Sequence, residues 1–265
     1  MRYSACIFSL LAFILLAASL SSCSIKEDRE PCPCYLRVSF EDRSVIDDDV
    51  CIIGWRDGEL FRRTIDVSKY DPYWITAVHK GMLQVVTCMG LDEMNSDGHY
   101  AVIPYGSQCD SLYSFFADVD ATGDDVLVES SLKKQFATVH VDISRSAAEM
   151  KDYRFRVTGN SCGFDLLDFS PLKGDFMYVP VPAPGQRVVD FRIPRQKDSS
   201  LSLAVWRGDD EIGTFPIGDY VRRLGYKWDT KELQDIYLTI DFIIGQVIIG
   251  IDNWEDGVAI TFIEQ

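Results

Sequence analysis

Histidine and basic residues are scarce in this chain of 265 residues. Only His79, His99 and His140 occur, which argues against a metal site built from several histidines. Lysine and arginine number 26 against 41 acidic residues, so the formal net charge is −15. A chain this acidic repels the phosphates of nucleic acids and anionic lipids, and we expect no nucleic-acid partner. Apolar residues make up 47% of the chain, which is enough to build a folded core.

An apolar stretch near the N-terminus is too short to span a bilayer comfortably. It covers the 16 residues Ala5–Leu20 and follows Arg2, whereas a transmembrane helix needs about 20 residues. This pattern is typical of a secretory signal peptide, here over residues 1–22. Its end, Leu20-Ser21-Ser22-Cys23, resembles the bacterial lipobox, where the peptidase cuts before a lipid-modified cysteine. We expect Cys23 to carry diacylglycerol on sulfur and an acyl chain on nitrogen; a plain signal peptide is the alternative.

The residues after the cysteine are expected to form a tether. Residues 23–34 contain charged residues and proline with little apolar content, so we interpret them as a lipidated flexible segment. Lys26-Glu27-Asp28 resembles the surface-export signal of Bacteroidetes lipoproteins, and a solvated linker is the alternative. The combined signals predict a protein anchored in the outer membrane by lipid and exposed at the cell surface.

The rest of the chain shows the two-residue period of β-strands. In Tyr35–Glu41, apolar and polar residues alternate. Turn pairs such as Asp57-Gly58 and Asp97-Gly98 separate such segments, as expected for antiparallel sandwiches. Further alternating segments are Thr138–Ile143, Tyr153–Thr158, Val189–Ile193, Leu201–Val205, Ile236–Phe242 and Val258–Phe262.

Two domains fit this number of strands better than one sheet. The best boundary lies near Glu129–Lys134, so we expect an N-terminal β-sandwich over residues 35–131 and a C-terminal one over 132–265.

Only a few short helices are expected. Asp219 is placed to cap a helix over Tyr220–Leu224, with Gly225 ending it. A turn or two is expected over Ser146–Lys151.

Two sequence motifs suggest chemistry and are judged structural. Gly159-Asn160-Ser161-Cys162-Gly163 matches a nucleophile elbow, but all three histidines precede Ser161 and no helix is expected after it. We interpret it as a glycine-rich turn.

Asp118–Glu129 has the spacing of a calcium loop, but its flanks resemble strands. A hairpin turn is favoured there, and calcium binding stays open. The sequence therefore predicts no catalytic residue, cofactor or metal site.

Six cysteines remain after Cys6 in the signal and Cys23 under lipid. An exported chain meets an oxidising compartment, so structural disulfides or a mixture with buried thiols are expected, with 15 possible connectivities. The six are Cys32, Cys34, Cys51, Cys88, Cys109 and Cys162.

Together these features resemble the FimB-type fimbrial anchor lipoproteins of Bacteroidales. Besides the lipid signals, the resemblance rests on four segments: Cys32-Pro33-Cys34, Gly54–Leu60, Gly225–Trp228 and Asp252–Gly257. It covers most of the expected mature chain. It implies two transthyretin-like β-sandwich domains and a non-enzymatic role at the base of a fimbrium. It also implies that the major fimbrillin subunit is the partner, bound by strand complementation.

A surface glycan-binding lipoprotein is the alternative function, because it would share the signal, the sheets and exposed tryptophans. Coplanar exposed aromatic side chains would favour glycan binding, and an open sheet edge would favour assembly. The apolar segments Gln246–Asp252 and Val258–Ile263 must be buried or paired with a partner, since an open apolar edge invites aggregation.

Localisation gives the first prediction. Cys23→Ala should leave the protein soluble in the periplasm, because the acyl chains are lost. Replacing Lys26, Glu27 and Asp28 with alanine should keep the lipid but lose surface exposure. Cell fractionation and protease shaving of intact cells measure both effects. Shaving of the triple variant at the wild-type rate would rule out the export signal.

Overall fold

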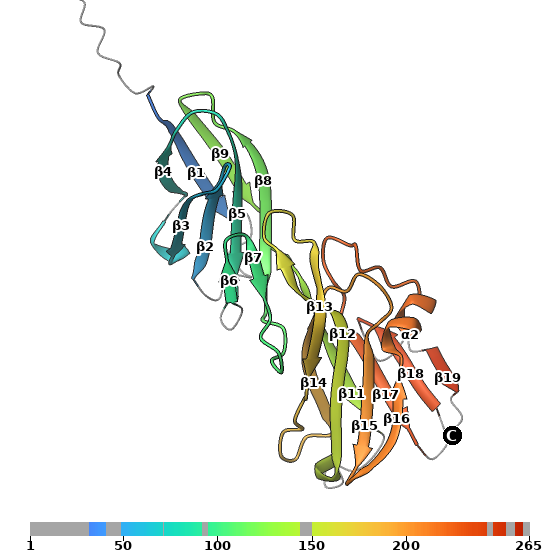
Figure 1. The fold of residues 1–265 in the computed structure, drawn as a ribbon. Coiled ribbons are helices and arrows are strands. Elements are labelled where there is room, and N and C mark those ends of the chain that lie inside the picture. Colours follow the sequence, from blue (N-terminus) through green and yellow to red (C-terminus); the bar gives the residue numbers. More distant parts are fainter. Residues whose placement is uncertain are drawn as a thin grey trace, which may run out of the picture.

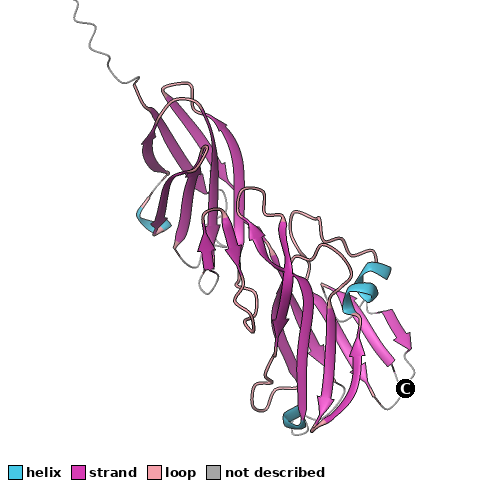
Figure 2. Cartoon of the chain, in the orientation of Figure 1, coloured by secondary structure: helices cyan, strands magenta, loops and turns pink. Residues whose placement is uncertain are grey.

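The chain folds almost entirely into β-strands (Figures 1 and 2). The structure is a computed structural model that describes residues 32–40, 49–70, 72–91, 95–143, 150–242, 246–252 and 258–261. Of the described residues, 57% lie in strands and 6% in helices, which confirms the all-β sandwich class expected from the sequence. Within the described ranges, no helix is both long and apolar enough to cross a membrane.

The N-terminal half consists of two facing sheets. A three-stranded sheet has the order β4-β1-β9, and a five-stranded sheet has the order β10-β8-β5-β2-β3. The elements are β1 (Cys34–Phe40), β2 (Val50–Trp55), β3 (Glu59–Ile65), the 3-10 helix η2 (Val67–Lys69), β4 (Trp74–Val78), β5 (Met82–Met89), β8 (Tyr113–Asp120), β9 (Asp125–Ser130) and β10 (Lys133–Lys134).

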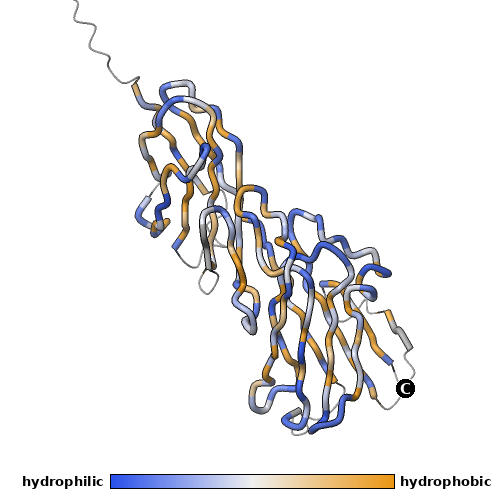
Figure 3. Tube along the Cα trace, viewed as in Figure 1, coloured by the Kyte–Doolittle hydropathy of each residue, from blue (hydrophilic) through white to orange (hydrophobic). Residues whose placement is uncertain are grey.

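Side chains of alternating positions fill the space between these two sheets. On β1, Leu36 and Val38 are completely buried, whereas Tyr35 is 51% exposed, as the two-residue period predicts. Val50 and Ile52 of β2 meet them from the five-stranded sheet. Figure 3 shows the resulting alternation of apolar and polar residues along the strands.

The C-terminal half is a larger sandwich. One sheet has the order β14-β11-β17-β18-β19, and the other has the order β16-β15-β12-β7-β6, with β13 paired to β12. The elements are β6 (Asn95–Asp97), β7 (Tyr100–Val102), β11 (Phe136–Asp142), η3 (Met150–Asp152), β12 (Tyr153–Asp165), β13 (Pro171–Tyr178), β14 (Val188–Pro194), β15 (Ser202–Arg207), β16 (Asp210–Phe215), α2 (Ile217–Arg223), β17 (Ile236–Asp241), β18 (Gln246–Ile251) and β19 (Val258–Thr261).

The five-stranded sheet of the N-terminal half is covered on both faces. Val50 and Ile52 point into the N-terminal core, whereas Ile53 and Val86 belong to a second core that also contains Phe155 of β12. The segment that follows β5 makes this junction, because β7 precedes the expected domain boundary yet pairs with β12. The core of the C-terminal half therefore extends onto one face of the N-terminal five-stranded sheet.

Two strand pairs are parallel in an otherwise antiparallel arrangement. β1 pairs in parallel with β9, and β11 pairs in parallel with β17. Period-two patterning reports which face of a strand is buried and says nothing about the direction of its neighbour. In each pair the chain passes through the other sheet of the sandwich before it returns to lie parallel to the first strand. Such a return requires a long connection.

The helix α2 begins earlier than the sequence pattern indicated. It spans Ile217–Arg223, so Asp219 lies in its first turn and pairs with Arg222 at 2.9 Å instead of capping the helix. Pro216 precedes the helix, and proline's fixed φ suits a helix start. Gly225 ends the helix as expected, with a φ of +83° that favours glycine.

The shared core gives the second prediction. Leu112 lies in it and is completely buried, whereas Leu127 on β9 is 50% exposed. Leu112→Ala should lower the free energy of unfolding by about 2–5 kcal/mol, because it leaves a cavity between the halves. Leu127→Ala is the matched control and should change it by less than about 0.5 kcal/mol.

Urea unfolding followed by circular dichroism and tryptophan fluorescence measures both variants. Equal effects of the two substitutions would contradict a core that is continuous across the halves.

Candidate functional site

The residues of the expected lipid anchor and export signal lie outside the described residues. These are Leu20, Ser21, Ser22, Cys23, Lys26, Glu27 and Asp28. The described chain enters the fold at Cys32, and β1 begins at Cys34. β1 lies at one end of the elongated molecule and β19 at the other (Figure 1).

The nucleophile-like motif is part of a bulged strand, so the expectation of a turn was wrong. Ser161 lies within β12, is completely buried and has no hydrogen-bond partner for its hydroxyl. The glycines of the motif serve packing. A Cβ on Gly159 would lie 2.5 Å from Oε1 of Gln196, and one on Gly163 would lie 2.1 Å from the carbonyl oxygen of Ala101. Gly163 thus lets β7 approach β12 closely enough to pair.

The calcium-like segment is a crossover between sheets and not a hairpin. β8 and β9 belong to opposite sheets of the N-terminal sandwich, so the hairpin expectation was wrong. Three of its carboxylates already have partners: Asp120 accepts hydrogen bonds from Thr122, Asp124 pairs with Lys80 at 2.7 Å, and Asp125 pairs with Arg37 at 3.1 Å. Across the described ranges, no group of three or more acidic, histidine or cysteine side chains is arranged to hold a metal ion.

The six cysteines are thiols in this structure, and no disulfide joins them. Cys34, Cys88 and Cys109 are buried, Cys51 and Cys162 are partly buried, and Cys32 is exposed. Burial raises the pKa of the Cys34 and Cys109 thiols, which makes them poor nucleophiles.

Several sheet edges carry charges that discourage pairing with another chain. The edge strand β3 contains Glu59, Arg62 and Arg63, and the edge strand β16 contains Asp210 and Glu211. Charged side chains on edge strands prevent aggregation through strand addition.

Two edge strands lack this protection. β4 has the sequence Trp-Ile-Thr-Ala-Val, and β19 has the sequence Val-Ala-Ile-Thr. Each pairs with a neighbour on one side, β4 with β1 and β19 with β18, and in the described residues no strand lies on the other side. Ile75 on β4 is 48% exposed and Val258 on β19 is 49% exposed. These two edges are therefore candidates for pairing with a partner strand.

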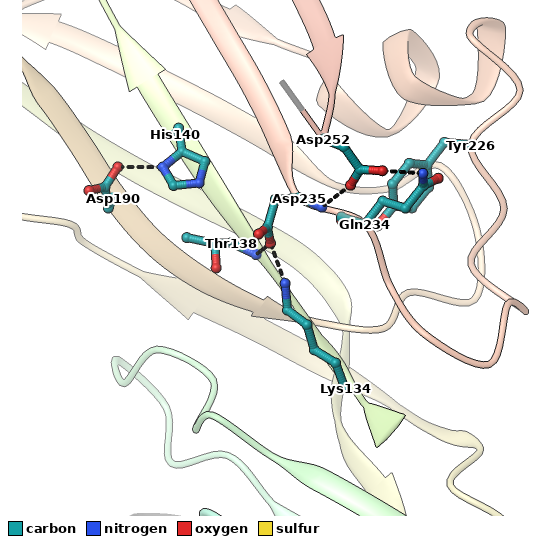
Figure 4. Close-up of polar contacts among 8 residues, drawn as sticks. All are labelled: Lys134, Thr138, His140, Asp190, Tyr226, Gln234, Asp235 and Asp252. Carbon is teal, nitrogen blue, oxygen red and sulfur yellow. Dashed lines mark hydrogen bonds and ion pairs between the residues drawn. The ribbon is translucent and has the colours of Figure 1, made fainter. Parts of the chain in front are cut away.

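Asp235 fastens the last strands to the C-terminal sandwich (Figure 4). Its Oδ1 accepts a hydrogen bond from the backbone N–H of Thr138 and an ion pair from Nζ of Lys134, both at 2.6 Å. Because Asp235 immediately precedes β17 and Thr138 lies on β11, this carboxylate fixes where β17 begins beside β11.

Asp252 completes this cluster from the end of β18. Its carboxylate accepts hydrogen bonds from the side chain of Gln234 and, at 3.2 Å, from the backbone N–H of Asp235. The hydroxyl of Tyr226 donates to the carbonyl oxygen of Gln234 at 2.8 Å. Burial, together with the charges of Asp235 and Asp252, raises the pKa of Tyr226, so this hydroxyl remains a donor at neutral pH. The cluster holds the β17–β18 hairpin, and through it β19, in place.

His140 belongs to the outer face of the same sheet. Its Nδ1 lies 2.8 Å from Oδ1 of Asp190, and its ring stacks on Tyr237 with centroids 4.4 Å apart. Burial, followed by the nearby charge of Asp235, raises the pKa of Tyr237. These side chains bridge β14, β11 and β17 and support the sheet.

The sequence indicated that the β18 and β19 segments are buried or paired, but it did not predict the cluster of Asp235 and Asp252 that holds them. Lys134 and Asp235 are 101 positions apart, and single aspartates beside strands form no recognisable motif. The sequence indicated that the apolar terminal segments are either buried or paired with a partner. Val247 and Ile249 of β18 are buried in the C-terminal core.

A cavity of about 710 Å³ lies where the two halves meet. Phe115 and Phe116 of β8 line it on one side, and Phe169 and Arg195 line it from the C-terminal half. Arg195 is 8% exposed, and its guanidinium donates to the carbonyl oxygens of Trp228 and Thr230. The cavity is large enough for a small ligand.

The fold defined by these sheets is a two-part β-sandwich that also occurs in solved structures of other proteins. No family model matches the chain, and no curated protein matches it by sequence. Among solved structures, a candidate adhesin from Bacteroides ovatus superposes with a TM-score of 0.62 at 13% identity, covering 91% of this chain and 99% of that one.

Two further solved structures share the fold. A candidate polysaccharide-binding protein from Bacteroides thetaiotaomicron has a TM-score of 0.62 at 14% identity and covers 87% of this chain and 99% of its own. The fimbrial anchor protein Mfa2 from Porphyromonas gingivalis has a TM-score of 0.57 at 12% identity and covers 84% of this chain and 98% of its own. At these identities the likeness establishes the fold.

The cluster at β17 gives the third prediction. Asp235→Ala removes the acceptor of Thr138 and Lys134 and should lower the free energy of unfolding by about 1–3 kcal/mol. Hydrogen exchange should accelerate in β17 and β18 and stay unchanged in β1. Asp190→Ala, which removes an exposed ion-pair partner, is the control and should cost about 0–1 kcal/mol. Unchanged exchange in β17 after Asp235→Ala would show that the cluster does not secure the terminal strands.

Proposed function

We propose that this chain is an outer-membrane lipoprotein that anchors a fimbrium to the cell surface. The observation that carries the proposal is the uncharged edge of β19, at the end of the molecule opposite the start of β1 (Figure 1). One end would be held by lipid, and the other would offer its backbone to a fimbrillin strand. The fold shared with the fimbrial anchor Mfa2 and with a candidate adhesin supports this reading.

In this proposal the chain divides as the sequence suggests. A signal peptide over 1–22 is removed and residues 23–34 form the tether. Segments 35–131 and 132–265 then supply the two sandwiches, except that β6 and β7 join the second sandwich and β10 joins the first. The ten residues Ser24–Pro33, when fully extended, reach at most about 3.3–3.6 Å each. The N-terminal sandwich would therefore lie within a few nanometres of the membrane, and Lys26-Glu27-Asp28 would direct export to the surface.

Strand pairing at β19 uses the backbone groups that its neighbour β18 leaves free. An edge strand presents a row of unpaired N–H and C=O groups, and an added strand satisfies them while side-chain pockets set specificity. β4 is the less suitable edge because it lies beside β1, next to the tether. The absence of charge on β19 fits an edge that must accept a partner.

The proposed role is non-enzymatic. Ser161, the serine of the nucleophile-like motif, is buried within β12. His99 pairs with Asp165 and joins the β6–β7 turn to the end of β12. The solved structures with this fold bear names of adhesin, polysaccharide-binding and fimbrial anchor proteins, which supports the same reading.

Crosslinking in living cells tests the proposal. A photoreactive p-benzoylphenylalanine at position 258 on β19 should crosslink to the major fimbrillin subunit, because that side chain is exposed beside the open edge. The same group at position 181, where valine is 79% exposed and lies outside the strands, is the control and should not. Position 75 on β4 reports on the other open edge.

Two results would contradict the proposal. One is fimbrillin captured equally well from positions 181 and 258. The other is firm attachment of fimbriae of normal length in cells that lack this chain and any related anchor.

Glycan binding is the second candidate function, and the cavity between the halves favours it. Phe116 is 42% exposed and lines this cavity. Against it, the exposed ring of Phe116 meets the buried ring of Phe169 at 40°, so these two rings form no flat exposed platform. Calorimetric titration with surface polysaccharides, repeated with Phe116→Ala, would establish this function if binding occurs and the variant loses it.

A further inference from the structure

Cys51 and Cys88 face each other across the centre of the five-stranded sheet. They are directly opposed in the antiparallel register of β2 and β5. Opposed residues in such a pair have Cα atoms about 4.5–5.5 Å apart. A disulfide accepts Cα separations of about 4.4–6.8 Å, so the backbone is already positioned for a bond.

The two thiols are also in contact. A hydrogen bond joins the side chains of Cys51 and Cys88, which therefore point to the same face of the sheet. Cys88 is completely buried, and Cys51 is partly accessible from outside. The other strand cysteines lack this arrangement, since Cys34 is opposed by Val78 and Cys162 packs against Gly174.

The environment activates one of the two sulfurs. The hydrogen bond from Cys88, with help from the positive charge of Arg62, lowers the pKa of the Cys51 thiol to about 7. The same hydrogen bond, together with burial, raises the pKa of Cys88. Cys51 is thus partly thiolate at neutral pH and is the thiol that a reagent can reach, which are the two properties of an attacking sulfur.

We propose that Cys51 and Cys88 form a cross-strand disulfide in the exported protein, with an oxidised dithiol–disulfide oxidoreductase as electron acceptor. The thiolate of Cys51 attacks one sulfur of the oxidant's disulfide, forms a mixed disulfide and expels a thiolate. Cys88 gives its proton to solvent, attacks the sulfur of Cys51 and expels the second thiolate. The two cysteines lose two protons and two electrons, and the oxidant becomes a dithiol.

The bond would fasten the two central strands of the sheet that both cores share. It would also close the loop that contains β3 and β4, which are both edge strands. Its formation in cells rests on the proposed export, whereas its geometry does not.

Peptide mapping tests the proposal. The full-length protein is extracted from cells in detergent with N-ethylmaleimide present and digested without reduction. Trypsin followed by cleavage before aspartate is needed, because trypsin alone leaves Cys88 and Cys109 on one peptide. We expect a linked pair containing Cys51 and Cys88, two hydrogens lighter than the separate peptides. Maleimide on both cysteines would overturn the proposal.

A second experiment distinguishes two reasons for a missing disulfide: the two cysteines cannot bond, or the protein never reaches an oxidising compartment. The purified protein, first reduced, is treated with oxidised glutathione and mapped in the same way. The wild type and Cys162→Ala should form the link, and Cys51→Ala should not. A link in this arm with free thiols in the cell-derived protein would refute the bond in cells and count against export, and hence against the proposed function. Free thiols in both arms, with a native circular dichroism spectrum, would refute the geometry alone.

Discussion

The five-stranded sheet of the N-terminal half has apolar side chains on both faces, and the rest of the structure depends on covering both. Ile52 lies on one face and Ile53 on the other, and each is buried. A sheet exposed to water on one face would leave the second set of side chains uncovered. The three-stranded sheet covers one face, and the segment that contains β7 covers the other, where it continues into the C-terminal core.

This requirement explains the junction between the halves. β7 pairs with β12, and the N–H of Ile103 donates to the carbonyl oxygen of Cys162 at 2.8 Å. Nε of Arg192 on β14 donates to the carbonyl oxygen of Cys109 at 2.8 Å. These contacts join the two halves through packed side chains and strand ladders.

The sequence predicted the strands well because their signal is local. Val139 and Val141 are buried on β11 as their two-residue period indicated. Parallel pairing of β11 with β17, the sharing of β7 between halves and the contact of Lys134 with Asp235 all join residues far apart in sequence, and no local pattern encodes them. The glycines around Ser161 misled the sequence analysis in another way. Their local pattern suggested a turn, but Gly159 and Gly163 lie within β12, where a side chain would collide with Gln196 and with the backbone of Ala101.

The open edge of β19 is a property of the sheet order, which period-two patterning does not reveal. The apolar composition of the terminal segments still indicated that they must be buried or paired. The structure buries Val247 and Ile249 of β18 and leaves Val258 of β19 half exposed. Asp235 and Asp252 hold this arrangement from one end of the sheet (Figure 4).

Hydrogen–deuterium exchange on the protein alone and in complex with fimbrillin tests strand pairing at β19 most directly. Backbone amides of an edge strand slow their exchange when a new strand satisfies them. Anchoring through this edge predicts that residues 258–261 gain protection in the complex, while the charged edge strand β16 does not change. Protection confined to the cavity between the halves, with none at β19, would contradict it.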